Sequence, residues 1–431
     1  MKKPELLLPA KGPEELKTAV TFGADAVYIG GQFMSLRASA RNFSPEEMKD
    51  SISFAHSRGA KVYVTANIFA HNGDLEAAGR YFSEIREIRP DALLISDPGI
   101  FDLAREVCPE IDIHISTQAN TTNYRTALFW RRLGARRLVV ARELSLQEIS
   151  ELRQHLPEDM EIEAFVHGAM CISYSGRCLL SNYFTGRDAN KGACSHPCRW
   201  RYSLVEETRP GVYLPVEENE RGTYVFNSKD LCMVSHIPEL VRAGVNSLKI
   251  EGRMKNALYV AVTARTYRKA IDDFFESEQV YRDNIPRYEE EIRKCTTRQF
   301  YTGFYFGKPD VDSQIYDNNT YTQDYVYLGI VEDVTEDGGA VIRQKNKFSV
   351  GDQIEVMKPG GENVPMRVEE IRDPEMGNMP SAPHPGQRLF LRLSELKGSE
   401  PLFRQDSGFD RQGKSSGLID IGDVLRIRKQ D

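Results

Sequence analysis

The first 250 or so residues alternate short apolar runs with amphipathic stretches. The apolar runs are mostly continuous rather than alternating, which is typical of parallel strands that are covered by helices. This pattern predicts eight strands, at residues 5–9, 26–30, 61–67, 92–96, 111–116, 137–141, 161–166 and 247–250.

The segments between these strands carry apolar residues at spacings of three and four, as amphipathic helices do. The predicted helices are 14–22, 45–58, 75–88, 98–107, 123–133, 145–156 and 238–243, with 257–275 after the last strand. Eight β/α units predict a (β/α)8 barrel of the TIM type. An open doubly wound sheet is the alternative, because strand order cannot be read from a sequence.

The regular alternation ends at two places, and these divide the chain. About 80 residues separate the seventh strand from the eighth, where a β/α unit needs about 30, so we place an insertion at 168–235. The barrel is expected to span 1–277, followed by a polar and aromatic connector at 278–325. From 326 to 431, short β runs alternate with turn signals such as Pro385-Gly386 and predict a small all-β barrel or sandwich. Those runs are 326–332, 340–345, 353–357, 364–371, 388–393 and 424–429.

Composition and charge narrow the class of protein. The chain is 40% hydrophobic and 28% charged, as ordinary globular proteins are, and no apolar run approaches the roughly 20 residues that span a bilayer. The N-terminal apolar run is too short for a signal peptide, so we expect a cytoplasmic protein. A net charge of −7 argues against a surface that coats nucleic acid, but it leaves room for local basic patches such as Arg199-Trp200-Arg201.

Five of the seven cysteines fall in the insertion: Cys171, Cys178, Cys194, Cys198 and Cys232. In a reducing cytosol, clustered cysteines are more often metal ligands or redox groups than disulfides. Zinc sites usually show paired C-x2–4-C knuckles, and only the segment from Cys194 to Cys198 has such spacing. Iron–sulfur clusters tolerate irregular spacing, so we favour an iron–sulfur cluster over zinc and over inert buried cysteines.

Polar residues follow several of the predicted strands. In (β/α)8 barrels the carboxyl ends of the strands carry the chemistry, although each such residue alone is as readily a cap or turn residue. Arginines at this face would bind carboxylates in a bidentate manner. We predict catalytic roles for Arg142, Glu143, His167, Glu251 and Arg253, and substrate-binding roles for Arg37, Arg41, Asn67, Gln118 and Lys249.

Residues 163–181 carry a specific motif, EAFVHGAMC followed by GRCLLS, and 227–231 and 247–253 carry the blocks NSKDL and SLKIEGR. These segments resemble the collagenase-like peptidase family, U32, and the resemblance extends over nearly the whole chain. The resemblance implies oxygen-independent hydroxylation rather than proteolysis, with a [4Fe–4S] cluster. The length and the C-terminal domain are most similar to the branch that hydroxylates the wobble uridine of tRNA at C5 with prephenate, a dicarboxylate.

Several alternatives follow from the same resemblance. Other branches act on 23S ribosomal RNA or on ubiquinone precursors, and members differ in whether the thiol matching Cys198 or Cys232 is present. We expect Cys171, Cys178, Cys194 and Cys198 as ligands, with Cys232 as the rival fourth, and a paralogous partner protein is conceivable. A peptidase is a further alternative, although the chain has neither H-E-x-x-H nor G-x-S-x-G. The third hypothesis for the function is a binding module that holds a structural metal and carries out no chemistry.

Overall fold

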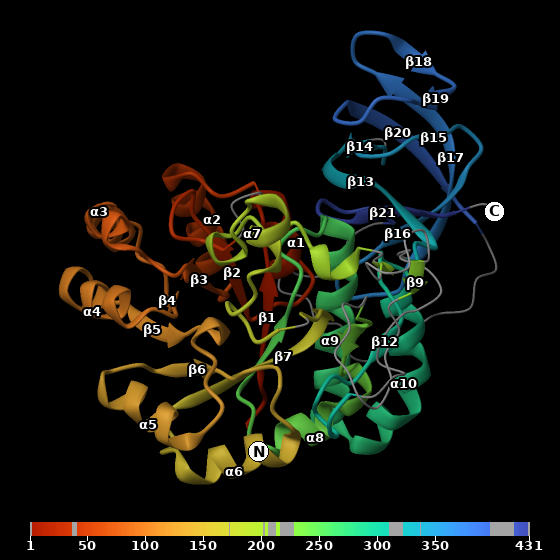
Figure 1. Cartoon of the computed structure of the whole chain (residues 1–431). Helices are drawn as coiled ribbons and strands as arrows, with labels where there is room; N and C mark the ends of the chain where they lie inside the picture. Colours follow the sequence, from red (N-terminus) through yellow and green to blue (C-terminus); the bar gives the residue numbers. More distant parts are fainter. Residues whose placement is uncertain are drawn as a thin grey trace. The chain divides into compact units, whose positions relative to one another are not determined.

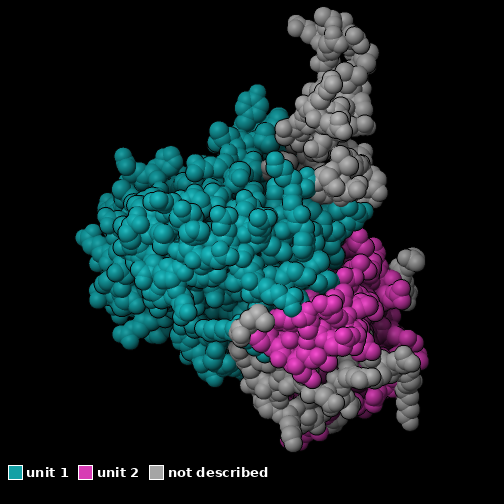
Figure 2. Space-filling model, turned by 90° about the horizontal axis from the view of Figure 1, so that it is seen from below, with its two compact units in different colours: residues 1–13, 25–254, 298–321 teal, residues 14–24, 255–297, 322–431 magenta. Residues whose placement is uncertain are grey.

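The chain divides into two compact units, which Figure 2 colours separately. The first comprises 1–13, 25–254 and 298–321, and the second comprises 14–24, 255–297 and 322–431. This computed structural model describes residues 2–36, 41–171, 173–200, 203–205, 213–215, 228–309, 322–336, 338–396 and 418–429. Every helix within these ranges is too short or too polar to cross a lipid bilayer.

Eight parallel strands within the described residues of the first unit form a closed barrel. Each strand pairs with the next from β1 to β7, and β11 pairs with both β7 and β1. Closure confirms the predicted (β/α)8 barrel and excludes an open sheet. The strands are β1 (Glu5–Pro9), β2 (Ala26–Gly30), β3 (Lys61–Ala66), β4 (Ala92–Ile95), β5 (Asp112–Ile115), β6 (Arg137–Val139), β7 (Glu161–Ala169) and β11 (Ser247–Ile250).

Helices of the first unit lie outside the strands (Figure 1). They are α2 (Pro45–Ser57), α3 (Leu75–Ile88), α4 (Pro98–Val107), α5 (Tyr124–Arg132), α6 (Leu146–His155) and α8 (Ile237–Arg242). The start of α2 shows how local sequence sets these bounds. Ser44 accepts a hydrogen bond from the Glu47 N–H, and the Glu47 side chain accepts one from the Ser44 N–H. This reciprocal capping satisfies two N–H groups that would otherwise lack partners, so the helix begins here.

Two further short strands pair beside β7, one from the insertion and one from the predicted connector, and periodicity did not predict them. β10 (Asp230–Cys232) pairs antiparallel with the end of β7, and β12 (Phe300–Tyr301) pairs parallel with β10. The nine-residue β7 extends beyond the three-residue β6, so its last residues are available for this pairing. The remaining elements of the insertion are α7 (Leu180–Thr185), η3 (Ala189–Lys191), η4 (Pro197–Arg199), β8 (Ser203–Val205), β9 (Tyr213–Pro215) and η5 (Val234–His236).

The second unit contains an antiparallel barrel with six strands in its described part. The strands run in the order β16-β21-β13-β14-β20-β17, and β16 pairs with β17 to close the ring. The predicted all-β barrel is therefore confirmed, and a sandwich is excluded. Its core includes Ile342, Val356, Met366, Leu391 and Leu425. The strands are β13 (Tyr325–Val334), β14 (Ala340–Gln344), β16 (Gln353–Met357), β17 (Val364–Asp373), β20 (Arg388–Glu395) and β21 (Val424–Arg428), with short β15 (Phe348–Ser349), β18 (Gly377–Met379) and β19 (Ser381–Ala382).

The second unit also contains the helices α9 (Ala257–Glu276) and α10 (Glu278–Arg293). It contains α1 (Pro13–Thr21) as well, except for the first residue of that helix. The sequence predicted a connector where α10 lies, because Pro286 interrupts the helical pattern and the segment is strongly polar. Glu291 shows why the helix is needed. Its buried carboxylate binds Arg265 of α9 at 2.7 Å and Arg426 of β21 at 2.9 Å. Burial raises the pKa of Glu291, but the two guanidinium groups outweigh burial and lower it.

We predict that Glu291→Ala lowers the free energy of unfolding by about 3–5 kcal/mol, because it leaves two buried guanidinium groups without their carboxylate. The matched control is Glu290→Ala, one residue away. The Glu290 side chain is 65% exposed and binds only Lys294, so its loss costs at most about 1 kcal/mol. Urea unfolding of the full chain measures both. Equal effects of the two substitutions would contradict the role we assign to Glu291.

Candidate active site at the barrel mouth

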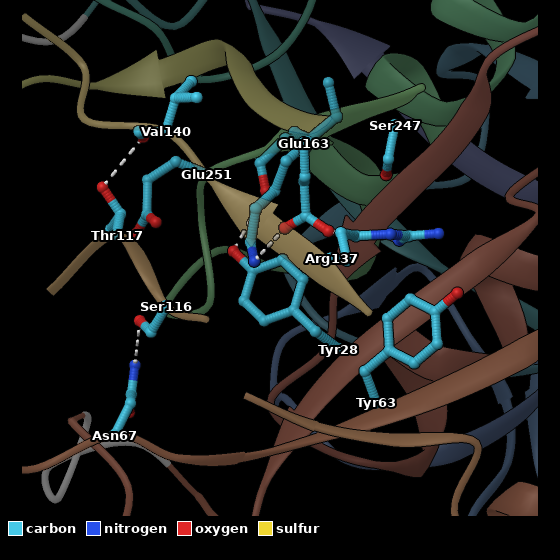
Figure 3. Close-up of polar contacts among 12 residues, drawn as sticks. Tyr28, Tyr63, Asn67, Ser116, Thr117, Arg137, Val140, Glu163, Ser247 and Glu251 are labelled. Carbon is cyan, nitrogen blue, oxygen red and sulfur yellow. Dashed lines mark hydrogen bonds and ion pairs between the residues drawn. The ribbon is translucent and has the colours of Figure 1, made fainter. Parts of the chain in front are cut away.

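A network of charged side chains fills the inside of the barrel (Figure 3). Arg137 of β6 binds Glu5 of β1 at 2.6 Å, Glu161 at 2.6 Å and Glu163 at 3.2 Å, the last two on β7. Glu163 in turn accepts from the Nζ of Lys249 on β11, at 2.6 Å. Four strands are therefore cross-linked by ion pairs that are mostly buried, although the Glu161 side chain is 37% exposed.

Burial and the neighbouring charges shift the pKa values of this network. Burial lowers the pKa of Lys249 more than Glu163 raises it, so the net shift is downward. Burial raises the pKa of Glu5, but the charge and hydrogen bonds of Arg137 outweigh burial and lower it. Lys249, predicted as a substrate-binding residue, lies inside the barrel and contacts the rings of Tyr28 and Phe165. Its predicted role stays a prediction.

Sequence reasoning missed most of this network. Arg137 belongs to a basic run that also contains Arg131, Arg132 and Arg136. Such a run is usually solvated or ion-paired at the surface. Arg131 is indeed paired at the surface, with Asp159 at 2.7 Å, but Arg137 is buried. The available signal was Glu161 and Glu163, two carboxylates at alternate positions of an otherwise apolar strand, because alternate residues of a strand point to one face.

His114 of β5 lies beside this network. It is buried, and its ring meets the Tyr63 ring edge-on at 4.7 Å between centroids. Burial lowers the pKa of His114 well below its ordinary value, and the positive charges of Arg137 and Lys249 lower it further. His114 is therefore neutral in the folded protein throughout the physiological range.

Arg142 and Glu251 meet at the carboxyl ends of the strands. The Arg142 guanidinium donates to the Ala169 carbonyl at 2.9 Å, lies 3.4 Å from Glu251 and covers the Phe165 ring at 3.9 Å. Glu143 follows directly, and burial raises the pKa of its carboxyl group. The structure therefore brings together two of the predicted catalytic residues, with a third next to them in the chain.

His167 and Glu251 are placed by the same stretch of backbone. His167 is buried on β7, and its ring lies 5.5 Å from that of Phe300. Gly168 has a φ of +102°, and a Cβ there would lie 2.4 Å from the Glu251 carbonyl oxygen. Only glycine allows β7 and the end of β11 to approach this closely.

Arg253 forms a second polar cluster at the mouth. Its guanidinium donates to Asn42 at 2.6 Å and to Thr65 at 3.2 Å, and it also binds Ser35. Next to it, the Asn67 side chain donates to Ser116 at 3.3 Å. Arg41 is exposed and binds Glu47, and Arg37 lies outside the described residues, so their predicted substrate-binding roles stay predictions.

The cysteine-rich insertion packs on the barrel through two contacts. The Asn120 side chain donates to the Ser175 carbonyl at 2.8 Å. Gly176 has a φ of +72°, and a Cβ there would lie 2.4 Å from both the Gln118 Oε1 and the Phe69 ring. Gln118, predicted as a substrate-binding residue, therefore contacts the segment between Cys171 and Cys178. Beside this contact lies an open cavity of about 330 Å³, lined by Phe69, His71, Gly176, Arg177, Leu179, Asp188, Asn190 and Lys191.

Hydrogen bonds also hold together the segments that carry Cys178 and Cys194. Ser181, three residues after Cys178, bonds the Ser195 side chain at 3.0 Å and accepts from the Ser195 N–H at 3.0 Å. The His196 N–H points at the Cys194 Sγ at 3.4 Å. Backbone N–H groups directed at cysteine sulfur are one of the means by which proteins tune iron–sulfur clusters.

Among the residues that the structure describes, the five cysteines of the insertion form no disulfide bonds, and they are not gathered at one point. Cys171 lies two residues beyond β7, Cys198 lies in η4, and Cys232 lies on β10 opposite His167. In the described part of the chain, no three His, Cys, Asp or Glu side chains form a group that would hold a metal ion. The chemistry of the donors fits a cluster, since four soft ligands lie between residues 171 and 198.

We predict that His114→Gln flattens the dependence of stability on pH. Neutral His114 must take up a proton when the chain unfolds below pH 6.5, so acidification favours the unfolded state. Between about pH 6 and 5, the wild type should lose up to about 1.4 kcal/mol per pH unit relative to the variant. Chemical unfolding of both proteins across this window measures the difference. Parallel curves would contradict a neutral buried His114.

A (β/α)8 barrel with a cysteine-rich loop on its mouth, joined to a six-stranded β-barrel, defines the class of this protein. The model of peptidase family U32 matches residues 11–315, and that of the U32 C-terminal domain matches 323–402. The chain belongs to the peptidase U32 family.

Curated relatives carry names from RNA modification. Over 395 residues, the chain is 39% identical to tRNA hydroxylation protein P1 of Bacillus subtilis, which covers 91% of this chain and 93% of the relative. It is 39% identical over 435 residues to tRNA hydroxylation protein P of Escherichia coli, covering 92% and 95%. It is 36% identical over 300 residues to the 23S rRNA 5-hydroxycytidine C2501 synthase of Escherichia coli, covering 69% of this chain and 44% of that protein.

Proposed function

We propose that this protein hydroxylates tRNA, at C5 of the wobble uridine, in a reaction that uses prephenate and an iron–sulfur cluster instead of molecular oxygen. One observation carries the proposal: two relatives named for tRNA hydroxylation match more than nine-tenths of this chain and more than nine-tenths of their own length. The match to the ribosomal RNA synthase covers less than half of that protein, which favours tRNA as the substrate.

Cys171, Cys178 and Cys194 would be three of the cluster ligands, and Cys198 or Cys232 the fourth. The hydrogen bonds between the Cys178 and Cys194 segments and the N–H directed at the Cys194 sulfur support this assignment. When bound, a [4Fe–4S] cluster supplies electron transfer or an iron site beside the substrate. The contact between Gly176 and Gln118 would keep the Cys171–Cys178 segment at the barrel mouth.

Arg142 and Arg253 would bind the carboxylates of the small-molecule substrate. Both guanidinium groups are held at the mouth by contacts that set their orientation, Arg142 by the Ala169 carbonyl and Arg253 by Asn42 and Thr65. Fixed guanidinium groups bind dicarboxylates with little loss of side-chain entropy. Burial raises the pKa of Glu143, which suits a carboxyl group that holds a proton for transfer.

We predict that a strain lacking this gene has tRNA without 5-hydroxyuridine derivatives. Wild-type protein should restore them, and Arg142→Gln should not, because the substrate carboxylate would lose its partner. Arg131→Gln is the control: Arg131 is a surface arginine paired with Asp159, so this variant should restore them fully. Mass analysis of digested tRNA measures the outcome. Unchanged nucleosides in the deletion strain, together with peptide cleavage by the purified protein, would favour a peptidase instead.

We predict that protein purified without air contains about four iron and four sulfide per chain. Serine substitution of Cys171, Cys178 or Cys194 should remove most of the iron. Cys198→Ser or Cys232→Ser should also remove it, but only one of these two, because only one of them is the fourth ligand. Cys108→Ser and Cys295→Ser are the controls, because both thiols are buried away from the insertion. Iron and sulfide assays, together with a visible absorption spectrum, measure the cluster content of each variant. Iron-free wild-type protein would overturn the assignment.

A further inference from the structure

Three of the exposed aromatic side chains in the cysteine-rich insertion lie next to one another. Tyr183 is 82% exposed, Phe184 46% and Trp200 44%. The rings of Tyr183 and Phe184 are 5.2 Å apart between centroids, and those of Phe184 and Trp200 are 6.3 Å apart. The three rings therefore form one continuous exposed patch, which we call the aromatic patch. Scattered exposed rings are ordinary, but contiguous ones mark interaction surfaces.

The way α7 packs explains why the rings lie outside. In this six-residue helix the buried side chain is that of Ser181, which bonds Ser195, and Thr185 lies 3.1 Å from the same hydroxyl at an exposed position. An ordinary amphipathic helix buries its rings and exposes its hydroxyl groups. Because α7 buries Ser181 and exposes its rings instead, Tyr183 and Phe184 contribute little to a core.

The charge of this segment differs in sign from that of the chain. Residues 171–200 contain four basic residues and one acidic residue, a formal charge of +3 in a chain of −7. They are Arg177, Arg187, Lys191 and Arg199, against Asp188. Arg177 and Arg187 are exposed, and neither forms a salt bridge with any described residue, whereas Lys191 binds Asp74 at 3.3 Å. Two exposed guanidinium groups thus lie in the same segment as the aromatic patch, six residues before Tyr183 and three residues after Phe184.

We propose that Tyr183, Phe184 and Trp200 stack on unpaired bases of RNA while Arg177 and Arg187 bind its phosphates. That the RNA is tRNA rests on the proposed function. A base must leave its stack to enter a barrel mouth, so its neighbours are unpaired too and expose their faces. The aromatic patch lies on the loop that packs on the mouth, with Tyr183 five residues after Cys178 and Trp200 two residues after Cys198.

RNA fits this patch better than an apolar protein surface does. Rings that alternate with cations match the alternation of bases and phosphates in a single strand, and such stacking tolerates any base sequence. An apolar protein partner would instead bury Arg177 and Arg187 without counter-charges, which is costly. The surface is therefore expected to give affinity, while the barrel mouth selects the uridine.

The test is binding of unmodified tRNA to the full chain purified without air, followed by fluorescence anisotropy. Tyr183→Leu and Trp200→Leu keep apolar area but remove a ring, and each should raise Kd by roughly 5- to 150-fold. Tyr183→Phe keeps the ring and should bind as the wild type does. Phe129→Leu is the matched control, since Phe129 is 45% exposed but lies on α5, outside the insertion.

The salt dependence tests the phosphate contacts separately. Arg187→Ala should lower the slope of log K against log salt concentration by roughly 0.7–0.9, the value for one lost phosphate contact. Tyr183→Leu should weaken binding without changing this slope. A slope unaltered by Arg187→Ala would remove Arg187 from the interface.

The outcomes separate this inference from the proposed function. Suppose that the deletion strain lacks 5-hydroxyuridine derivatives. If the leucine variants then bind tRNA as the wild type does, or if the wild type binds no tRNA, the stacking surface is wrong and tRNA hydroxylation stands. If the nucleosides are unchanged and the wild type binds no tRNA, both are wrong. If the leucine variants alter the sedimentation of the protein but not its tRNA affinity, the patch is a protein interface.

Discussion

The ion pairs of Glu163 are the interaction on which the arrangement of the mouth depends. Glu163 is fully buried, and Arg137 and Lys249 bind its carboxyl group from the neighbouring strands β6 and β11. A buried carboxylate that lost one of these partners would be strongly destabilising, so the register of the strands around it is well defined. In that register Phe165 lies beside Lys249, and His167 lies beside Ile250 across an irregularity.

The residues at the mouth follow from this register. β7 continues from Glu163 through His167 to Ala169, whose carbonyl holds Arg142, and then to Cys171. β11 continues from Lys249 to Glu251 and Arg253, and Gly168 lets the two chains approach where they leave the barrel. The charged layer inside the barrel and the polar groups at its mouth thus lie on the same two strands, one layer above the other. This explains why the EAFVHGAMC and SLKIEGR segments combine buried charges with mouth residues.

The second unit uses the same physical device in a different place. Glu291 of α10 binds Arg265 of α9 and Arg426 of β21, and Arg426 also binds Glu355 at 2.5 Å. In both units a buried carboxylate is shared by two cations from different elements, so each element is fixed relative to the others. The insertion differs from both units. Its contacts include hydroxyl, amide and backbone hydrogen bonds and the partly exposed ion pair of Lys191 with Asp74, and its Arg177 and Arg187 are exposed.

Local sequence patterns predicted the barrel strands and most of the helices of this protein. Apolar periodicity located the eight barrel strands and the six strands of the second barrel, and Ser44-Pro45 located the start of α2, because these signals act between neighbouring residues. Tertiary structure alone decided that Arg137 is buried against Glu5, 132 residues away, since only closure of the barrel brings β1 and β6 to one interior. It also decided that α10 is a helix despite Pro286, and that β10 joins β7, because buried ion pairs and ladder hydrogen bonds with distant residues stabilise both. Periodicity reports which face of a segment is buried, but not which distant charge it will meet there.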